Sequence, residues 1–362
     1  MKITDVQAHL LAIPSKETDF PPAWALRDFY HIIVEIKTDA GITGYGDAFG
    51  YFVPHATASV VNYVLKPMIM GADPTQISSL HEQMYRQTHL AGRYGITTFA
   101  ISGVDIALWD IAGKCAGLPL YRLLGGVKDT KVPAYASLPR YGNLDKLKAA
   151  ALHAYRSGFE VIKLHQLDVE SLRTVRQAVG EDVRLMMDIN CAWSPEQALE
   201  MAEQLAPYNL FWLEEPIWPP EDFVSLARLG YQSEMPLAAG ENACTAYQFK
   251  AMLDAEAVTY IQPSVTKLGG ISEWRKVAVL AETYNVKVAP HSPYFGPGLL
   301  ATSHLVATSP CAAMVEYYYA NLEASVFKEP PKVEKGHILL PTGPGLGLEI
   351  DPIVLQRYRV GS

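Results

Sequence analysis

The sequence lacks features that several protein classes require, beginning with cysteine. Only four of its 362 residues are cysteines, and no two of them form a Cys-x-x-Cys pair. This spacing fits neither a structural zinc site nor a disulfide framework. We therefore expect reduced thiols and a cytoplasmic protein.

Excess positive charge and long apolar runs are missing too. The net charge is −8, which argues against a nucleic-acid partner because phosphates require a basic surface. No uninterrupted apolar run approaches the roughly 20 residues that span a bilayer. Residues 1–5 show no apolar stretch of the signal-peptide type. We therefore expect neither a membrane nor a nucleic acid as partner.

What the sequence does contain is typical of a soluble enzyme, with 49% hydrophobic and 19% charged residues. Its length is sufficient for a large core and for two domains. Residues 32–37 and 43–46 flank a turn at 39–41 and predict a β-hairpin. Apolar residues at helical spacing predict a long helix over 97–116, and the glycine pair at 125–126 marks a domain boundary.

Three carboxylates are evenly spaced in the middle of the chain. Asp188, Glu214 and Glu241 lie 26 and 27 residues apart, and each follows a short, mostly apolar run. A strand, a helix and two short loops have about this combined length. Each acid is therefore expected at the end of one strand of a parallel sheet. Three converging acids would repel one another, and one Mg²⁺ ion, which prefers oxygen ligands, would relieve this repulsion.

The same spacing continues on both sides of the acids and predicts eight strands. A closed eight-stranded barrel carries its chemistry at the carboxyl ends of its strands, so the predicted fold class is α/β with a TIM-type barrel. The predicted domains are an α+β domain at 1–125, the barrel at 126–325, and a segment at 326–362 that packs back on the first domain. The other positions in the series are Ser137, Lys163, Ser264, His291 and Glu316.

Basic and polar residues share the inward face of these predicted strands. Alternate residues of a strand lie on one face, so Lys163 and His165 both point into the barrel mouth. Asn190 shares the face of the first carboxylate and is expected to orient a ligand. Of two adjacent acids, Glu214 is predicted to face inward, while Glu215 points outward and forms a structural ion pair.

In this order and spacing, the residues resemble the enolase superfamily, and within it the mandelate racemase-like subgroup. The resemblance covers nearly the whole chain. It is carried by residues 100–110, 212–216 and 267–270 and by the motifs Lys163-Leu164-His165, Asp188-Ile189-Asn190, Gly240-Glu241-Asn242 and Pro290-His291-Ser292.

The resemblance implies an α+β capping domain over a modified (β/α)₇β barrel, in which one of the eight units is irregular. It implies Mg²⁺ on Asp188, Glu214 and Glu241. The implied chemistry is removal of the proton next to a substrate carboxylate, by a Lys or His base, to give a metal-stabilised enediolate. The implied partners are a small-molecule carboxylate substrate and further copies of the chain in a homo-oligomer.

Two positions depart from the common patterns of this subgroup. Many relatives carry Lys-x-Lys on the second strand, with the second Lys as base, whereas this chain has His165. An imidazole is more easily a free base at pH 7 than a lysine. Lys163 then stays charged and binds a substrate carboxylate or lowers the pKa of His165. Ser264 stands where many relatives pair an Asp with the late-strand His, so His291 is expected to be neutral more often.

The two imidazoles are predicted to act from opposite faces of the substrate. His165, assisted by Lys163, removes a proton, and His291 returns one or protonates a leaving hydroxyl. Glu316 resembles the family's acid that hydrogen-bonds the enediolate oxygen. Dehydration of a hydroxy acid is the first expectation. Racemisation or epimerisation of a hydroxy or amino acid derivative is the alternative, followed by cycloisomerisation and by a non-catalytic ligand-binding barrel.

Substrate specificity is expected to come mainly from two aromatic loops of the capping domain, at residues 19–24 and 49–55. Both loops are poor in Arg and Lys. They suit a smaller, partly apolar acid, or one bearing a cation, better than a sugar diacid. Lys267, three residues after Ser264, is assigned a structural or loop role. The predicted substrate-binding residues are Phe20, Trp24, Tyr51, Phe52, Tyr135, Ser137 and Asn190.

Overall fold

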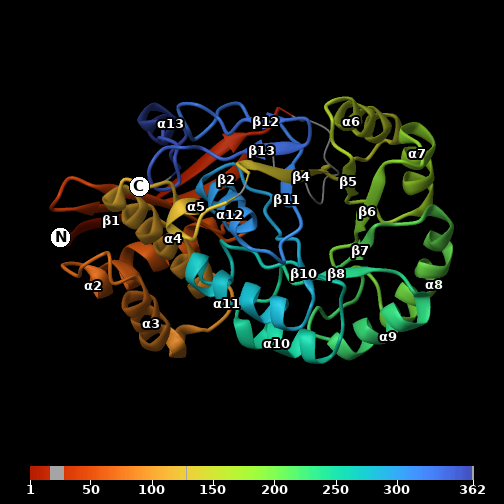
Figure 1. Ribbon diagram of the computed structural model, residues 1–362, viewed down its shortest axis with the longest axis horizontal. Coiled ribbons are helices and arrows are strands. Elements are labelled where there is room, and N and C mark those ends of the chain that lie inside the picture. Colours follow the sequence, from red (N-terminus) through yellow and green to blue (C-terminus); the bar gives the residue numbers. More distant parts are fainter. Residues whose placement is uncertain (17–27, 128, 361–362) are drawn as a thin grey trace.

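The computed structural model describes residues 1–16, 28–127 and 129–360. Within these residues the chain forms an α+β domain and a barrel, which lie side by side (Figure 1). The predicted fold, a modified (β/α)₇β barrel with a capping domain, is confirmed.

The capping domain is built on a three-stranded antiparallel sheet in the order β1-β2-β3. The predicted hairpin is present, with Ile36 of β2 opposite Gly44 of β3. Helices cover one face of the sheet and bury its apolar side chains. The elements are β1 (Ile3–Pro14), β2 (Asp28–Thr38), β3 (Thr43–Ala48), α1 (Pro54–Ser59), the π-helix η2 (Val60–Leu65), α2 (Lys66–Ile69), α3 (Ile77–Thr88), η3 (His89–Ala91), α4 (Ile96–Ala116) and α5 (Leu120–Leu123).

Helix α4 packs closely on β3 because glycines remove side chains from the contact. A Cβ atom on Gly46 would lie 1.9 Å from the carbonyl oxygen of Gly103 in α4. The helix ends at Gly117, whose φ of 65° gives a left-handed C-terminal cap. By length and hydropathy α4 could cross a membrane, but 78% of its apolar window is buried inside the protein. It is therefore a helix of the protein core.

The barrel contains eight parallel strands. They pair in the order in which they occur in the chain, from β4 to β10, and β11 pairs with β4. A bridge between Val288 and Ala312 joins β10 to the start of the last strand and closes the ring. The strands are β4 (Lys131–Ser137), β5 (Val161–Leu164), β6 (Arg184–Asp188), β7 (Trp212–Glu214), β8 (Leu237–Ala239), β9 (Tyr260–Ile261), β10 (Lys287–Val288) and β11 (Val315–Tyr318).

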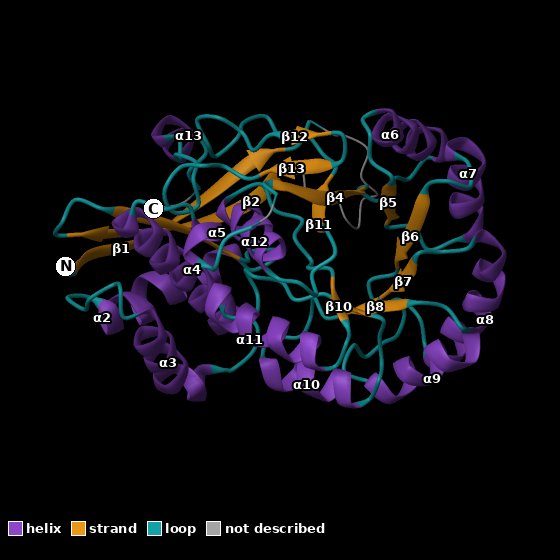
Figure 2. Cartoon of the chain, in the orientation of Figure 1, coloured by secondary structure: helices purple, strands orange, loops and turns teal. Residues whose placement is uncertain are grey.

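Helices alternate with these strands and lie outside them, as the purple ribbons around the orange strands show (Figure 2). Polar side chains start several of them by accepting hydrogen bonds from the first backbone N–H groups, as Asn143, Asp168 and Ser194 do for α6, α7 and α8. The helices are α6 (Leu144–Arg156), α7 (Val169–Val179), α8 (Pro195–Leu205), η4 (Ala206–Tyr208), α9 (Phe223–Ser233), α10 (Ala246–Asp254), α11 (Gly270–Thr283) and α12 (Pro297–Thr308).

A layer of apolar side chains, one from each strand or its end, fills the centre of the barrel. Strand residues two positions further along point the same way, so a second layer lies directly above the first. That second layer contains Lys163, Asp188, Glu214, His291 and Glu316, and it carries the candidate site. The apolar layer consists of Tyr135, Val161, Met186, Trp212, Ala238, Tyr260, Ala289 and Met314.

The C-terminal segment contacts both domains. It contains β12 (Val333–Glu334), β13 (His337–Leu339) and α13 (Pro352–Arg357). Strand β13 pairs antiparallel with the barrel strand β4. The backbone of Val360 donates a hydrogen bond to Leu10 of β1 in the capping sheet. The segment therefore joins the capping domain to the barrel, in addition to packing on the former.

Candidate active site

Three carboxylates meet at the carboxyl ends of β6, β7 and β8. One oxygen from each of Asp188, Glu214 and Glu241 lies within 4.8 Å of the others. Two of the acids are held in place by neighbours: the backbone N–H of Asn190 donates to Asp188, and the indole of Trp212 donates to Glu214. The evenly spaced acids of the sequence are thus brought together at one point.

Lys163 lies beside this cluster and is fully buried. Its ammonium nitrogen is 3.1 Å from Asp188 Oδ2, 2.7 Å from Glu214 Oε1 and 2.9 Å from Glu316 Oε1. Burial alone would lower the pKa of Lys163, but the surrounding carboxylates raise it well above its ordinary value. The surrounding carboxylates therefore favour the protonated, positively charged form of Lys163.

The cluster has more negative than positive groups. Besides Lys163, the ammonium group of Lys267 lies 3.7 Å from Glu241. Two ammonium groups thus face four carboxylates, those of the three clustered acids and Glu316. Burial and the Asp188 carboxylate raise the pKa of Glu214 well above its ordinary value. Burial would raise the pKa of Asp188 too, but Lys163 and His165 lower it. A divalent cation would balance the excess, and the all-oxygen donor set fits a hard cation.

His165 presents one ring nitrogen to the cluster. Its Nδ1 is 2.6 Å from the backbone carbonyl oxygen of Leu138. A carbonyl only accepts hydrogen bonds, so Nδ1 carries the proton in the neutral ring. Nε2, 3.3 Å from Asp188 Oδ2, then has the free lone pair. This arrangement suits a general base whose acceptor nitrogen faces the site.

His291 lies at the other side of the cluster, after β10. Its Nε2 is 3.1 Å from Glu241 Oε2, and its Nδ1 is 3.3 Å from the hydroxyl of Tyr294. Burial lowers the pKa of His291, which favours the neutral ring. The two imidazoles therefore contact different acids of the cluster.

Glu316, on β11, is held by three donors. Ser137 Oγ donates to Oε1 over 2.6 Å, Lys163 contacts the same oxygen, and the backbone N–H of Ser292 donates to Oε2 over 2.8 Å. Burial would raise the pKa of Glu316, but Lys163 and His291 reduce it to about 2. In this arrangement Glu316 is ionised.

A pocket of about 320 Å³ opens above these residues, between the two domains. The barrel supplies polar groups to its wall, and the capping domain supplies aromatic rings. The lining residues are Phe29, Phe49, Tyr51, Phe52, Arg140, His165, Asn190, Glu241, Asn242, Lys267, His291, Pro293, Glu316 and Tyr318.

The structure places only some of the predicted substrate-binding residues at the pocket. Asn190, Tyr51 and Phe52 line the pocket. Phe20 and Trp24 lie outside the described residues.

Tyr135 and Ser137 require a correction, because both are fully buried below the pocket. Tyr135 belongs to the apolar layer and packs edge-on against Trp212, with its ring 5.8 Å from the Lys163 ammonium group. Ser137 is one layer higher, but its hydroxyl is bonded to Glu316.

Two residues near the pocket, Lys267 and Glu215, have surroundings that differ from those expected from the sequence. Lys267 was assigned a structural or loop role, but it lines the pocket. Strand β9 ends at Ile261, so the alternation of side chains along a strand does not determine where Lys267 points. Glu215 was expected to form an ion pair. It is buried and accepts a hydrogen bond from the side chain of Asn242. Burial and the Glu241 carboxylate raise the pKa of Glu215 to about 8. Arg140, which follows the first barrel strand, lines the pocket and donates to the carbonyl of His165.

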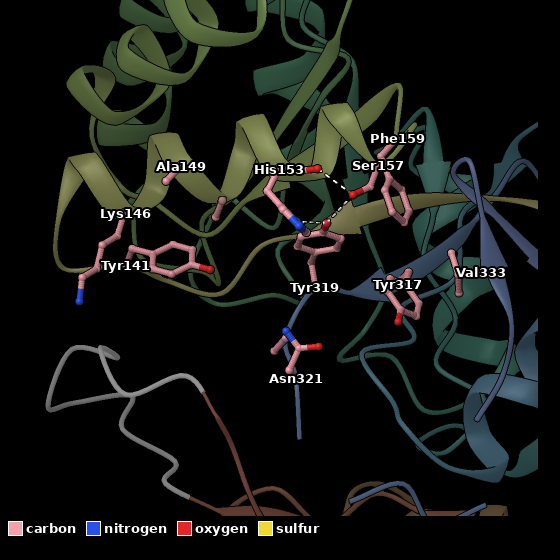
Figure 3. A pocket seen from close by; sticks show the side chains of 12 residues that line it. Tyr141, Lys146, Ala149, His153, Ser157, Phe159, Tyr317, Tyr319, Asn321 and Val333 are labelled. Atoms are coloured by element: carbon pink, nitrogen blue, oxygen red, sulfur yellow. Dashed lines mark hydrogen bonds between the residues drawn. The ribbon is translucent and has the colours of Figure 1, made fainter. Parts of the chain in front are cut away.

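A larger hollow of about 690 Å³ lies beside α6 (Figure 3). In it, the Tyr319 hydroxyl is 2.6 Å from Nδ1 of His153 and donates to Ser157. No carboxylate is among its lining residues. The smaller pocket, which contains the acids and both imidazoles, is therefore the candidate active site.

The barrel mouth thus combines a cluster of acids that could hold a metal ion with two imidazoles, a set of groups suited to acid–base chemistry. Residues 25–125 match the N-terminal domain of mandelate racemase and muconate lactonizing enzyme, and residues 146–354 match the enolase C-terminal domain-like family. The chain belongs to the mandelate racemase and muconate lactonizing enzyme family of the enolase superfamily. It is thus an enzyme of the lyase or isomerase type.

Three relatives illustrate the range of this similarity. An arabinonate dehydratase of Saccharolobus solfataricus is 36% identical, over 91% of both chains. A 3,6-anhydro-alpha-L-galactonate cycloisomerase of Streptomyces coelicolor is also 36% identical, over 97% of both chains. The structure of a racemase from Streptomyces coelicolor with bound magnesium superposes with a TM-score of 0.89 at 33% identity, covering 99% of this chain and 100% of that one.

Proposed function

We propose that this protein dehydrates a monocarboxylic sugar acid by removing the α-proton and expelling the β-hydroxyl. The observation that carries the proposal is the pair of imidazoles, His165 and His291, on two sides of a buried carboxylate cluster. The extended similarity to an arabinonate dehydratase supports the substrate class. Dehydration of hydroxy acids is chemistry that fits this superfamily.

We propose one Mg²⁺ ion as cofactor, held by Asp188, Glu214 and Glu241. The close oxygens, the excess of negative charge and the raised pKa of Glu214 support this assignment. A related racemase contains magnesium. When bound, the ion supplies a positive charge that stabilises the negative charge developing on the substrate carboxylate.

His165 removes the α-proton in this proposal. The proton passes from the α-carbon to Nε2, while Leu138 keeps the other proton on Nδ1. The electron pair of the broken C–H bond forms a double bond to the β-carbon as the β-hydroxyl leaves. Lys163 stays protonated and attracts the substrate carboxylate.

His291 protonates the departing hydroxyl, which leaves as water. The resulting enol becomes a 2-keto-3-deoxy acid as the β-carbon takes up a proton and the enol hydroxyl loses one to solvent. His291 must be an imidazolium to donate, although its burial favours the neutral ring. The nearby carboxylates Glu241 and Glu316 favour the charged form.

The pocket favours a hydroxylated substrate. Arg140, Asn190, Asn242 and Lys267 provide hydrogen-bond donors along its barrel side. The aromatic rings of the capping domain suggested a partly apolar acid, but these rings form only one wall. A sugar acid can bond to the barrel side and present its carbon-bound hydrogens to the aromatic side.

Epimerisation is the second candidate function. The lowered pKa of His291 makes it a proton acceptor when neutral, and two bases on two sides of an α-carbon exchange its configuration. The similarity to a racemase structure supports this candidate.

The deciding experiment follows arabinonate, xylonate and galactonate by NMR in D₂O with metal-stripped protein, before and after addition of MgCl₂. We expect Mg²⁺-dependent formation of a 2-keto-3-deoxy acid from at least one of them. Deuterium at the α-carbon without loss of water would favour epimerisation. Neither change with any of the acids would contradict both candidates.

We further propose a cytoplasmic homo-oligomer that binds neither nucleic acid nor membranes. The four cysteines are free thiols, which suits a reducing compartment. Size-exclusion chromatography with light scattering measures the assembly, and a monomer by this measurement would contradict its oligomeric part.

A further inference from the structure

The environment of His291 Nδ1 differs from that of a histidine paired with a carboxylate. Its partner in the described structure is the hydroxyl of Tyr294, 3.3 Å away. The Tyr294 hydroxyl in turn hydrogen-bonds to Ser264 Oγ. A row of three groups, His291, Tyr294 and Ser264, thus runs from the pocket into the protein.

This row can hold the ring of His291 in place whichever ring nitrogen carries the proton, because a hydroxyl can donate or accept a hydrogen bond. For Nε2 to accept a proton from the pocket, the proton of the neutral ring must be on Nδ1. Nδ1 then needs an acceptor, and the Tyr294 oxygen is in place to be one. Tyr294 can donate its own hydrogen to Ser264 Oγ, so its hydroxyl remains hydrogen-bonded while its oxygen accepts from Nδ1.

The surroundings hold Tyr294 in this position. Its backbone N–H donates to Ser292, whose own N–H and hydroxyl bond to Glu316. The Tyr294 ring meets the imidazole of His291 edge-on, at 5.9 Å between centroids. Burial raises the pKa of Tyr294 above its ordinary value, so the hydroxyl keeps its hydrogen.

We propose that Tyr294, backed by Ser264, is the positioning residue that orients the ring of His291 and accepts a hydrogen bond from the Nδ1 proton when Nε2 exchanges a proton with the substrate. A neutral hydroxyl performs the orienting part of a carboxylate's role without adding a negative charge beside the ring. This inference rests on the proposed function, in which His291 exchanges a proton with the substrate.

The test compares two rates in D₂O with MgCl₂. One is deuterium exchange at the α-carbon, and the other is formation of the dehydrated acid. The probes are three pairs of acids that differ at the α-carbon: arabinonate and ribonate, xylonate and lyxonate, and galactonate and talonate. The variants His165→Asn and His291→Asn first establish which rate depends on which imidazole.

Tyr294→Phe should lower the His291-dependent rate by about 10- to 100-fold, the usual effect of losing a group that orients a functional side chain. It should leave the His165-dependent rate near the parent value. Ser264→Ala should lower the same rate by a smaller factor, and it provides a second variant if Tyr294→Phe does not fold. A general structural defect would lower both rates together.

Tyr319→Phe is the matched control, because it removes another tyrosine hydroxyl bonded to a histidine Nδ1, outside the candidate site. Both of its rates should equal those of the parent. Equal rates in Tyr294→Phe and the parent, or an equal fall in both rates, would overturn the inference while the proposed function stands. A parent that neither exchanges nor dehydrates any of the six acids would overturn both.

Discussion

Two adjacent glutamates near the end of β7 have opposite environments. Glu214 lies in the acid cluster and contacts Lys163, whereas Glu215, with a φ of 41°, turns away toward Cys191 and Asn242. The turn in the backbone therefore decides which of the two side chains can reach a metal ion.

Replacing each glutamate with glutamine separates their roles. Glu214→Gln should weaken Mg²⁺ binding by roughly 10- to 100-fold, because it removes one charged oxygen ligand while keeping the side-chain shape. Glu215→Gln is the matched control and should bind Mg²⁺ like the parent. Isothermal titration calorimetry measures both affinities. An unchanged affinity in Glu214→Gln would refute the ligand assignment.

Residue types on regular strands could be predicted from the sequence, while those in loops could not. Asp188 and Glu214 end strands, so spacing and phase placed them. Tyr294 lies in an irregular segment, where neither spacing nor alternation constrains the side chain. Tyr135 points into the barrel but lies one layer deeper than the pocket, and strand alternation does not distinguish these two depths.

Among the elements, α4 and β3 have one of the closest contacts in the molecule. The backbone of Gly46 touches that of Gly103, and both strand and helix are buried there. A side chain on Gly46 would collide with the backbone of α4, so the helix would have to move away from the strand.

Gly46→Ala should therefore destabilise the protein by about 1–3 kcal/mol or more through overpacking. Gly142→Ala is the control, since a Cβ there meets nothing within 4 Å and the residue does not have a left-handed φ. Urea unfolding followed by circular dichroism compares the two. Equal midpoints for both variants would show that α4 shifts freely on the sheet.

The strand ends could be located from their even spacing in the sequence, because the β/α units have similar lengths. This prediction became less accurate where the strands are short. Strands β8 to β10 contain two or three residues, and Glu241, Ser264 and His291 all follow the strand ends. The turns after the strands determine where these side chains point. The even spacing in the sequence therefore predicted that the residues lie near the barrel mouth, but not the direction of each side chain.

The stability of the whole molecule should depend on pH through buried histidines in both domains. His31 in β2 and His304 in α12 are buried, and burial lowers the pKa of each from 6.5 to about 4. The unfolded chain binds protons on these groups at a higher pH than the folded chain does. Stability is therefore retained above about pH 6.5 and lost as the pH falls toward 4.

Between pH 7 and 5 each of the two histidines should remove about 2 kcal/mol from the unfolding free energy. His31→Phe and His304→Gln should each flatten this pH dependence by that amount. The exposed His89→Gln serves as control and should leave the slope unchanged. Urea titrations at a series of pH values measure the slope, and His31→Phe and His304→Gln variants whose slopes equal that of the parent would contradict the prediction.

The hydrogen bond from Val360 to Leu10 has a consequence for synthesis on the ribosome. Residues 358–360 bond to the edge strand β1, which leaves the ribosome much earlier. An uncovered edge strand can pair with other chains. The capping sheet is therefore begun first and completed last during translation, so the nascent chain carries an open strand edge throughout the production of the barrel.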